Sequence, residues 1–179
     1  MKSDGPVLSP AFRVASLAIL TAVTAVFTIV VRIPSPIRGG YFNLGDVAVV
    51  FTALTFGPLS ALVTAGIGTA LADLMLSSPQ WAPISLLVHG AQGLVMGLIA
   101  RAIPHRILPA YITAALAGAI GVLVMSGGYL AGGALLAGFG QALTEIPGNL
   151  VQSGVGVALG IPLSLAVCRA YPPVNTYTW

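Results

Sequence analysis

The chain has 179 residues, of which 57% are hydrophobic and only 6% charged, and its formal net charge is +3. An ordinary soluble domain is about one quarter charged, so this composition does not supply a water-exposed surface. One lysine and no run of basic residues argue against nucleic-acid binding. The single cysteine, Cys168, excludes an intrachain disulfide and a cysteine-cluster metal site. The composition therefore predicts a protein whose main solvent is lipid.

Long uncharged stretches indicate membrane-spanning helices, each of which needs about 20 apolar residues. The first, 14–31, is longer than the apolar part of a signal peptide and ends without a small-residue cleavage site, so we expect a retained helix. Proline and glycine positions divide the rest. We expect an all-α integral membrane protein with a single membrane domain, 1–179, a Gly-rich connector at 126–143, and six transmembrane helices at about 12–31, 41–56, 59–76, 83–100, 108–125 and 146–168.

The arginines and the lysine predict the orientation. Six spans place both termini on one side, and the first external loop on the other. The terminal side then carries Lys2, Arg13, Arg101, Arg106 and Arg169, against Arg32 and Arg38 on the opposite side. By the positive-inside rule, both termini are expected in the cytoplasm.

Polar side chains gather in the outer half of this arrangement. A carboxylate at the centre of a spanning helix costs about 2.5–3.5 kcal/mol on insertion scales, and less near the interface. Three acids from three different helices fall at similar outer depth, which favours convergence on an outward-facing ligand pocket, with Asp46 at its rim. The candidate ligand-binding residues are Arg38, Tyr41, Asn43, Asp46, Asp73, Trp81, His89, Glu145, Asn149 and Gln152.

Structural roles compete with ligand binding at several of these positions. Asp46 stands at a helix start, where the dipole favours a carboxylate, and Glu145 precedes a helix as a cap would. His89 has the alternative of a structural hydrogen bond, and Trp81 that of an interfacial aromatic. Asp73 lies at a helix C-terminus, where a negative charge is disfavoured. It therefore needs a partner such as an arginine, a backbone amide or a ligand amine.

Small residues recur on the first predicted helix. Such a stripe lets another helix approach closely, whether that helix belongs to this chain or to a partner. The stripe consists of Ala15, Ala18, Ala22 and Ala25.

Motifs of the common catalytic sites are absent from the sequence. It contains no Gly-x-x-x-x-Gly-Lys-Ser/Thr phosphate loop, no His-Glu-x-x-His metal motif and no Gly-x-Ser-x-Gly elbow. We therefore expect neither an enzyme nor a bound metal, and any ATP hydrolysis must come from other chains.

Short motifs follow one another in a characteristic order along the chain. They are Arg32-Ile-Pro, Gly39-Gly-Tyr-Phe-Asn-Leu-Gly-Asp46, Gly57-Pro-Leu59, Gly66-Ile-Gly-Thr-Ala-Leu-Ala-Asp73, Trp81-Ala-Pro83, the glycine-bearing helix Val88–Ile99 and Ile146-Pro-Gly-Asn-Leu-Val-Gln152. This ordered set resembles the substrate-binding S component of energy-coupling-factor (ECF) type ABC vitamin transporters, in the riboflavin-transporter-like branch. The resemblance covers about residues 13–168.

The resemblance implies a six-helix vitamin receptor in a prokaryotic cell membrane, with its pocket open to the outside. It also implies a transmembrane coupling protein and two ABC ATPases as partners on other chains. The family's Ala-x-x-x-Ala contact with the coupling protein corresponds to Ala18 and Ala22. Acids and amides in the pocket suit an aminopyrimidine thiamine precursor, with riboflavin and cobalamin as alternatives. The alternative function is a self-sufficient secondary transporter that uses Asp46, Asp73 and Glu145 as proton or cation sites.

Overall fold

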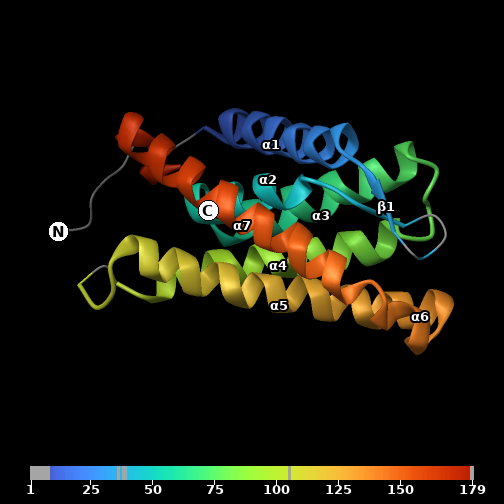
Figure 1. Ribbon diagram of the computed structural model, residues 1–179. Helices are drawn as coiled ribbons and strands as arrows, with labels where there is room; N and C mark the ends of the chain where they lie inside the picture. Colours follow the sequence, from blue (N-terminus) through green and yellow to red (C-terminus); the bar gives the residue numbers. More distant parts are fainter. Residues whose placement is uncertain (1–8, 36, 38–39, 105, 178–179) are drawn as a thin grey trace.

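Helices make up nearly all of the secondary structure in the computed structural model, which describes residues 9–35, 37, 40–104 and 106–177. The described elements are seven α-helices, one antiparallel hairpin and a terminal 3₁₀ helix (Figure 1). In chain order they are α1 (Pro10–Val30), β1 (Ile33–Pro34), β2 (Tyr41–Phe42), α2 (Gly45–Thr55), α3 (Pro58–Met75), α4 (Ala82–Ala102), α5 (Ala110–Ala137), α6 (Phe139–Leu143), α7 (Ile146–Ala170) and η1 (Pro172–Thr176).

Within the described residues, five helices are long and apolar enough to cross a membrane, namely α1, α3, α4, α5 and α7. Their outer faces carry large exposed apolar side chains, such as Val30 (72% exposed), Leu87 (71%) and Leu135 (88%). A surface of this kind is suited to lipid rather than water. The structure is therefore that of an all-helical protein with the character of a membrane protein.

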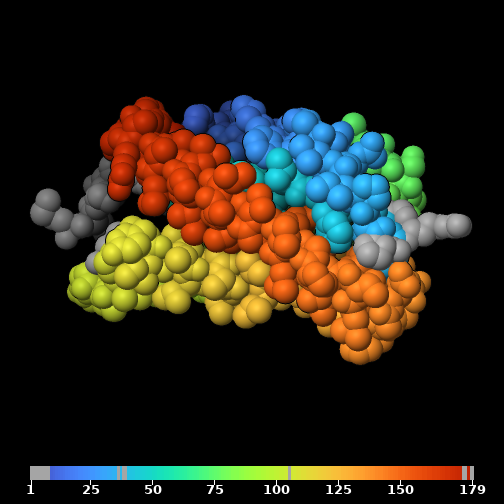
Figure 2. Space-filling model, in the orientation of Figure 1, coloured from blue at the N-terminus to red at the C-terminus, as the bar shows by residue number. Residues whose placement is uncertain are grey.

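Helix α2 is the central element of the bundle. Its 11 residues extend about 16 Å at 1.5 Å per residue, roughly half of a hydrocarbon core about 30 Å thick. It packs against α1, α3, α4 and α7, and α7 crosses the face between α1 and α5 so that little of α2 is visible (Figure 2). The β1–β2 hairpin directly precedes α2 in the chain.

The two ends of the bundle differ in their chemistry. At one end lie the start of α1, the end of α7 and the connection between α4 and α5; at the other lie the hairpin, the α3–α4 turn and α6 (Figure 1). The α2–α3 turn uses Gly57 at φ +95°, a left-handed conformation that favours glycine, and Pro58 then starts α3. The polar residues discussed below gather toward the hairpin end.

Four of the expected helices lie within about two residues of observed ones, α1, α3, α4 and α7. The helix expected at 41–56 begins instead at Gly45. Tyr41 and Phe42 pair with Pro34 and Ile33 as a short strand, and the side chain of Asn43 accepts a hydrogen bond from Gly45 N at 2.7 Å. Such an Asx turn ends the extended segment and lets the helix start only after it.

The expected division between a helix at 108–125 and a connector at 126–143 is also wrong. Helix α5 continues through the glycines to Ala137, and only the short α6 occupies the rest of the connector region. In lipid, a helix satisfies backbone groups that a glycine-rich loop would leave unpaired. Gly128 and Gly132 also let α5 approach α4, because a Cβ on either would meet Val88 or Ile84.

The alanine stripe on α1 faces away from the bundle for most of its length. Ala15, Ala18 and Ala22 are exposed, whereas Ala25 is buried. The buried side of α1 carries Thr24, which lies against α3. The stripe is therefore not used to pack α1 within this chain, except at Ala25.

Candidate functional site

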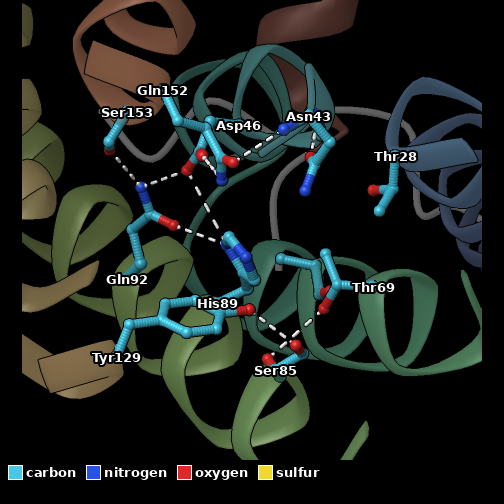
Figure 3. A network of polar contacts seen from close by, with 12 residues as sticks. Thr28, Asn43, Asp46, Thr69, Ser85, His89, Gln92, Tyr129, Gln152 and Ser153 are labelled. Carbon is cyan, nitrogen blue, oxygen red and sulfur yellow. Dashed lines mark hydrogen bonds and ion pairs between the residues drawn. The ribbon is translucent and has the colours of Figure 1, made fainter. Parts of the chain in front are cut away.

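Asp46 lies at the centre of a polar network that joins α2, α4 and α7 (Figure 3). Its carboxyl group is fully buried and accepts hydrogen bonds from Gln92 Nε2 at 2.6 Å and from Gln152 Nε2 at 2.8 Å. Gln92 Nε2 also donates to Ser153 Oγ at 3.0 Å. Burying a carboxyl group is unfavourable unless it is hydrogen-bonded, and the two amides meet that requirement.

The amide of Gln92 determines which nitrogen of His89 carries a proton. Because Gln92 Nε2 donates to two acceptors, its Oε1 must be the atom that faces His89 Nδ1 at 2.9 Å. His89 Nδ1 is therefore a donor, and it lies 3.7 Å from Asp46 Oδ1. In the neutral ring this arrangement leaves Nε2 as a hydrogen-bond acceptor.

Two side chains of the α7 region hold the hairpin segment in place. Gln152 Oε1 accepts a hydrogen bond from the backbone N–H of Asn43 at 2.7 Å, and Glu145 Oε1 accepts one from the N–H of Ile37 at 3.1 Å. Both side chains are buried. Since the amide nitrogen of Gln152 is bound to Asp46, the carboxyl group of Asp46 indirectly fixes the position of the hairpin.

A small cavity lies beside this network, between the hairpin and α1, α3, α4, α5 and α7. It leaves about 20 Å³ for the centres of water-sized molecules, which is room for about one water. A larger ligand therefore needs some movement of the lining. The lining residues are Thr28, Gly40, Tyr41, Asn43, Thr69, Asp73, Trp81, Ser85, His89, Met125, Tyr129, Glu145, Asn149 and Gln152.

The hairpin and α3 meet in this cavity through a short hydrogen bond. The hydroxyl of Tyr41 donates to Asp73 Oδ1 at 2.6 Å. The phenol hydroxyl is the donor in this contact, because an ionised carboxylate can only accept.

Three buried polar atoms around the cavity have no hydrogen-bond partner among the described residues. They are Asp73 Oδ2, Trp81 Nε1 and Asn149 Nδ2, on side chains that are 4%, 3% and 4% exposed. An unpaired buried polar group costs about 1–3 kcal/mol, so each has a reason to meet a ligand or an ordered water. One is an acceptor and two are donors.

Aromatic rings form one wall of the cavity. The ring centroid of Tyr129 lies 5.8 Å from that of Trp81 and 5.5 Å from that of His89. The hydroxyl of Tyr129 is 2.6 Å from Ser85 Oγ, which holds α5 against α4 at this depth. The wall is suited to contact with a flat ring.

The structure brings most of the expected ligand-binding residues into one place. Tyr41, Asn43, Asp73, Trp81, His89, Glu145, Asn149 and Gln152 all line the cavity. Arg38 lies outside the described residues. Asp46, which we expected at the pocket rim, does not line the cavity: it is fully buried and bonded to Gln92, which is halfway along α4.

Sequence reasoning missed several residues of the cavity and its support. Tyr129 was assigned to a connector rather than to a helix, so its depth could not be recognised. Ser85 and Thr69 are hydroxyl residues in apolar helices, where a structural back-bond is the usual reading, and Thr69 indeed donates to Ala65 O at 2.8 Å. The remaining ones are Thr28, Gly40, Gln92, Met125 and Ser153.

Comparison with known proteins identifies relatives over most of the chain. A protein of Pyrococcus woesei described as "Uncharacterized protein in gap 3'region" is 33% identical over 151 residues, which cover 83% of this chain and 97% of that protein. The "Thiamine precursor transporter HmpT" of Lactococcus lactis subsp. cremoris (strain MG1363) is 32% identical over 154 residues, 86% of each chain.

A family model matches a longer part of the chain than either relative does. The sequence model described as "ECF-type riboflavin transporter, S component" matches residues 11–169, which include every element from α2 to α6 and most of α1 and α7. The chain therefore belongs to the ECF-type riboflavin transporter S component family, whose members are transporter subunits and not enzymes.

Proposed function

We propose that this chain is the substrate-binding subunit of an ECF-type importer for a thiamine precursor of the aminopyrimidine class. The observation that carries the proposal is the convergence of three unpartnered buried polar atoms on one cavity with an aromatic wall. The resemblance to a thiamine precursor transporter over 86% of the chain supports the same class of ligand.

The donor and acceptor pattern of an aminopyrimidine matches these atoms. Its exocyclic amine can donate to Asp73 Oδ2, and its ring nitrogens can accept from Asn149 Nδ2 or Trp81 Nε1. In the neutral ring, His89 Nε2 offers a second acceptor for an N–H or O–H group of the ligand. The flat ring would lie against Tyr129. In this role Asp46 does not touch the ligand but orients His89 through Gln92.

The size of the cavity favours a small heterocycle over the alternatives. With room for about one water, the lining must open for any vitamin, and the displacement grows with the ligand. A single pyrimidine ring requires the least opening, riboflavin requires more, and cobalamin is many times larger than either. We therefore place riboflavin second and cobalamin last.

The proposed topology has six crossings, with the sixth made jointly by the hairpin segment and the short α2. Arg13, Arg101, Arg106 and Arg169 lie at the end where α1 begins and α7 ends, which favours that end as cytoplasmic. The cavity then opens outward past the hairpin. The exposed stripe of Ala15, Ala18 and Ala22, on the side of α1 away from the bundle, is the proposed contact with a transmembrane coupling protein that works with two ABC ATPases.

The proposal is tested by ligand binding to the purified protein in detergent. An aminopyrimidine should raise the melting temperature without any nucleotide, and the same pyrimidine lacking the amine should not. Asp73→Asn should weaken binding about 10- to 100-fold, the equivalent of one hydrogen bond to a charged group. Ser164→Ala, at the other end of the bundle, should leave binding unchanged. A shift with riboflavin alone would refute the ligand class.

Transport separates this function from a self-sufficient secondary transporter. Uptake should require the coupling protein and the ATPases, and it should persist when the proton gradient is collapsed while ATP is maintained. Undiminished uptake without those partners would favour the secondary transporter, with the buried acids as ion sites.

A further inference from the structure

A second cavity lies between α2, α4, α5 and α7, at the opposite end of the bundle from the polar network. It measures about 370 Å³ for the centres of water-sized molecules and is therefore far larger than the cavity around Asp73. The residues that line it come from the last turns of α2, α4 and α7 and from the first turns of α5. The ligand proposed above has no part in this second cavity.

The cavity holds one cation, Arg101, in the last turn of α4. Its guanidinium group lies against Gly57, where the missing side chain leaves space that any Cβ would fill. The acids of the described chain, Asp46, Asp73 and Glu145, all lie toward the other end. As far as the described residues go, Arg101 therefore faces the cavity without a carboxylate to neutralise it.

Like the positive charge of Arg101, a buried hydroxyl in this cavity points to an anionic ligand. Thr113, which is 1% exposed and lines the cavity, has no hydrogen-bond partner for Oγ1 among the described residues. It stands in the first turn of α5, whose start after Pro109 has no side-chain cap. The N-terminal N–H groups of a helix favour an anion. An unpaired hydroxyl donor, a cation and a helix start thus converge on one cavity.

The rest of the lining is mostly apolar and includes Leu54, Ala114 and Leu165. Arg101 marks the level at which a spanning helix ends, where lipid phosphates meet the hydrocarbon. Basic pockets between spanning helices at such levels are suited to anionic lipid headgroups. We propose that this cavity binds the phosphate of an anionic phospholipid, with Arg101 and Thr113 as its donors and the apolar walls against its acyl chains.

Cys168 provides a reporter for the test, because it is the only cysteine and lines the cavity. The rate of its reaction with a maleimide is measured by mass spectrometry on the full-length protein in detergent. Phosphatidylglycerol should protect Cys168, while phosphatidylcholine and inorganic phosphate at equal concentration should not. Protection by phosphatidylcholine would overturn the proposal, and protection by inorganic phosphate would reassign the site to a free anion.

Variants identify the groups that bind. Arg101→Gln should weaken the protection by phosphatidylglycerol about fivefold, the effect of about one basic residue at a membrane surface. Thr113→Val, which keeps the shape of the side chain, should also weaken it. Arg106→Gln removes the same charge at the same end but outside the cavity, and it should have no effect. Equal loss in Arg101→Gln and Arg106→Gln, or full protection in both Arg101→Gln and Thr113→Val, would refute the site.

Discussion

Replacing Asp46 by asparagine and by alanine should have very different effects on stability. A new asparagine can keep its oxygen toward Gln152, whose own amide cannot rotate because its Oε1 holds the backbone N–H of Asn43. Its new N–H₂ group then faces Gln92. If Gln92 rotates its amide, Oε1 accepts that hydrogen bond, and Nε2 donates to His89 Nδ1 in the other neutral tautomer. The contacts that join position 46, Gln92, Gln152 and His89 Nδ1 are then all kept as hydrogen bonds.

The alanine variant has no such solution. It removes two hydrogen bonds to the carboxyl group, each worth about 1.5–3 kcal/mol if the group is charged, and it leaves Gln152 Nε2 buried without an acceptor. The two hydrogen bonds together are worth about 3–6 kcal/mol. At about 2–4 °C per kcal/mol for a chain of this size, Asp46→Ala should lower the melting temperature by roughly 6–24 °C. Asp46→Asn should lower it by about 2–4 °C.

The assay is thermal unfolding of both variants in the same detergent without ligand. Nitrogen NMR of histidine supplies an independent readout, because Asp46→Asn should move the ring proton of His89 from Nδ1 to Nε2. If asparagine destabilises as much as alanine, or if the proton of His89 stays on Nδ1, the amide rotation does not occur and the assignment of this network is wrong.

Three further predictions follow from single contacts. Gly156→Ala places a Cβ against the backbone of Asp46, 2.9 Å from its carbonyl carbon. It should lower stability by about 1–3 kcal/mol in thermal unfolding. The control Gly154→Ala adds a Cβ in open space and should leave stability unchanged. Tyr41→Phe removes the hydrogen bond to Asp73 Oδ1 and should lower stability by about 1–3 kcal/mol in thermal unfolding. An unchanged melting temperature would contradict this. Ala22→Leu, on the exposed side of α1, should prevent co-purification with the coupling protein without changing ligand affinity. Loss of affinity with intact assembly would assign the alanine stripe of α1 to internal packing.

Much of the helical framework could be predicted because its signals are local. Uncharged stretches bounded by prolines and charges set α1, α3, α4 and α7 to within about two residues. The glycines of α5 led to a wrong prediction because glycine disfavours helices in water. In lipid, ending the helix would leave backbone N–H and C=O groups unpaired, which costs more than keeping glycine in a helix. That single error also concealed Tyr129 and the aromatic wall.

The sequence by itself determined a lipid-embedded helical chain, the family motifs and the gathering of acids and amides toward one end. It did not determine which of these groups touch one another. Asp46 binds Gln92 and Gln152, 46 and 106 positions away, and Asp73 Oδ2 stays unpaired although Tyr41 occupies Oδ1. Which side chains form hydrogen bonds depends on how closely the helices approach each other, as α7 approaches α2 where Gly156 lies against Asp46. It also depends on the position of the hairpin between the helices. Hydropathy and spacing place a residue at a depth, but only packing selects its partner.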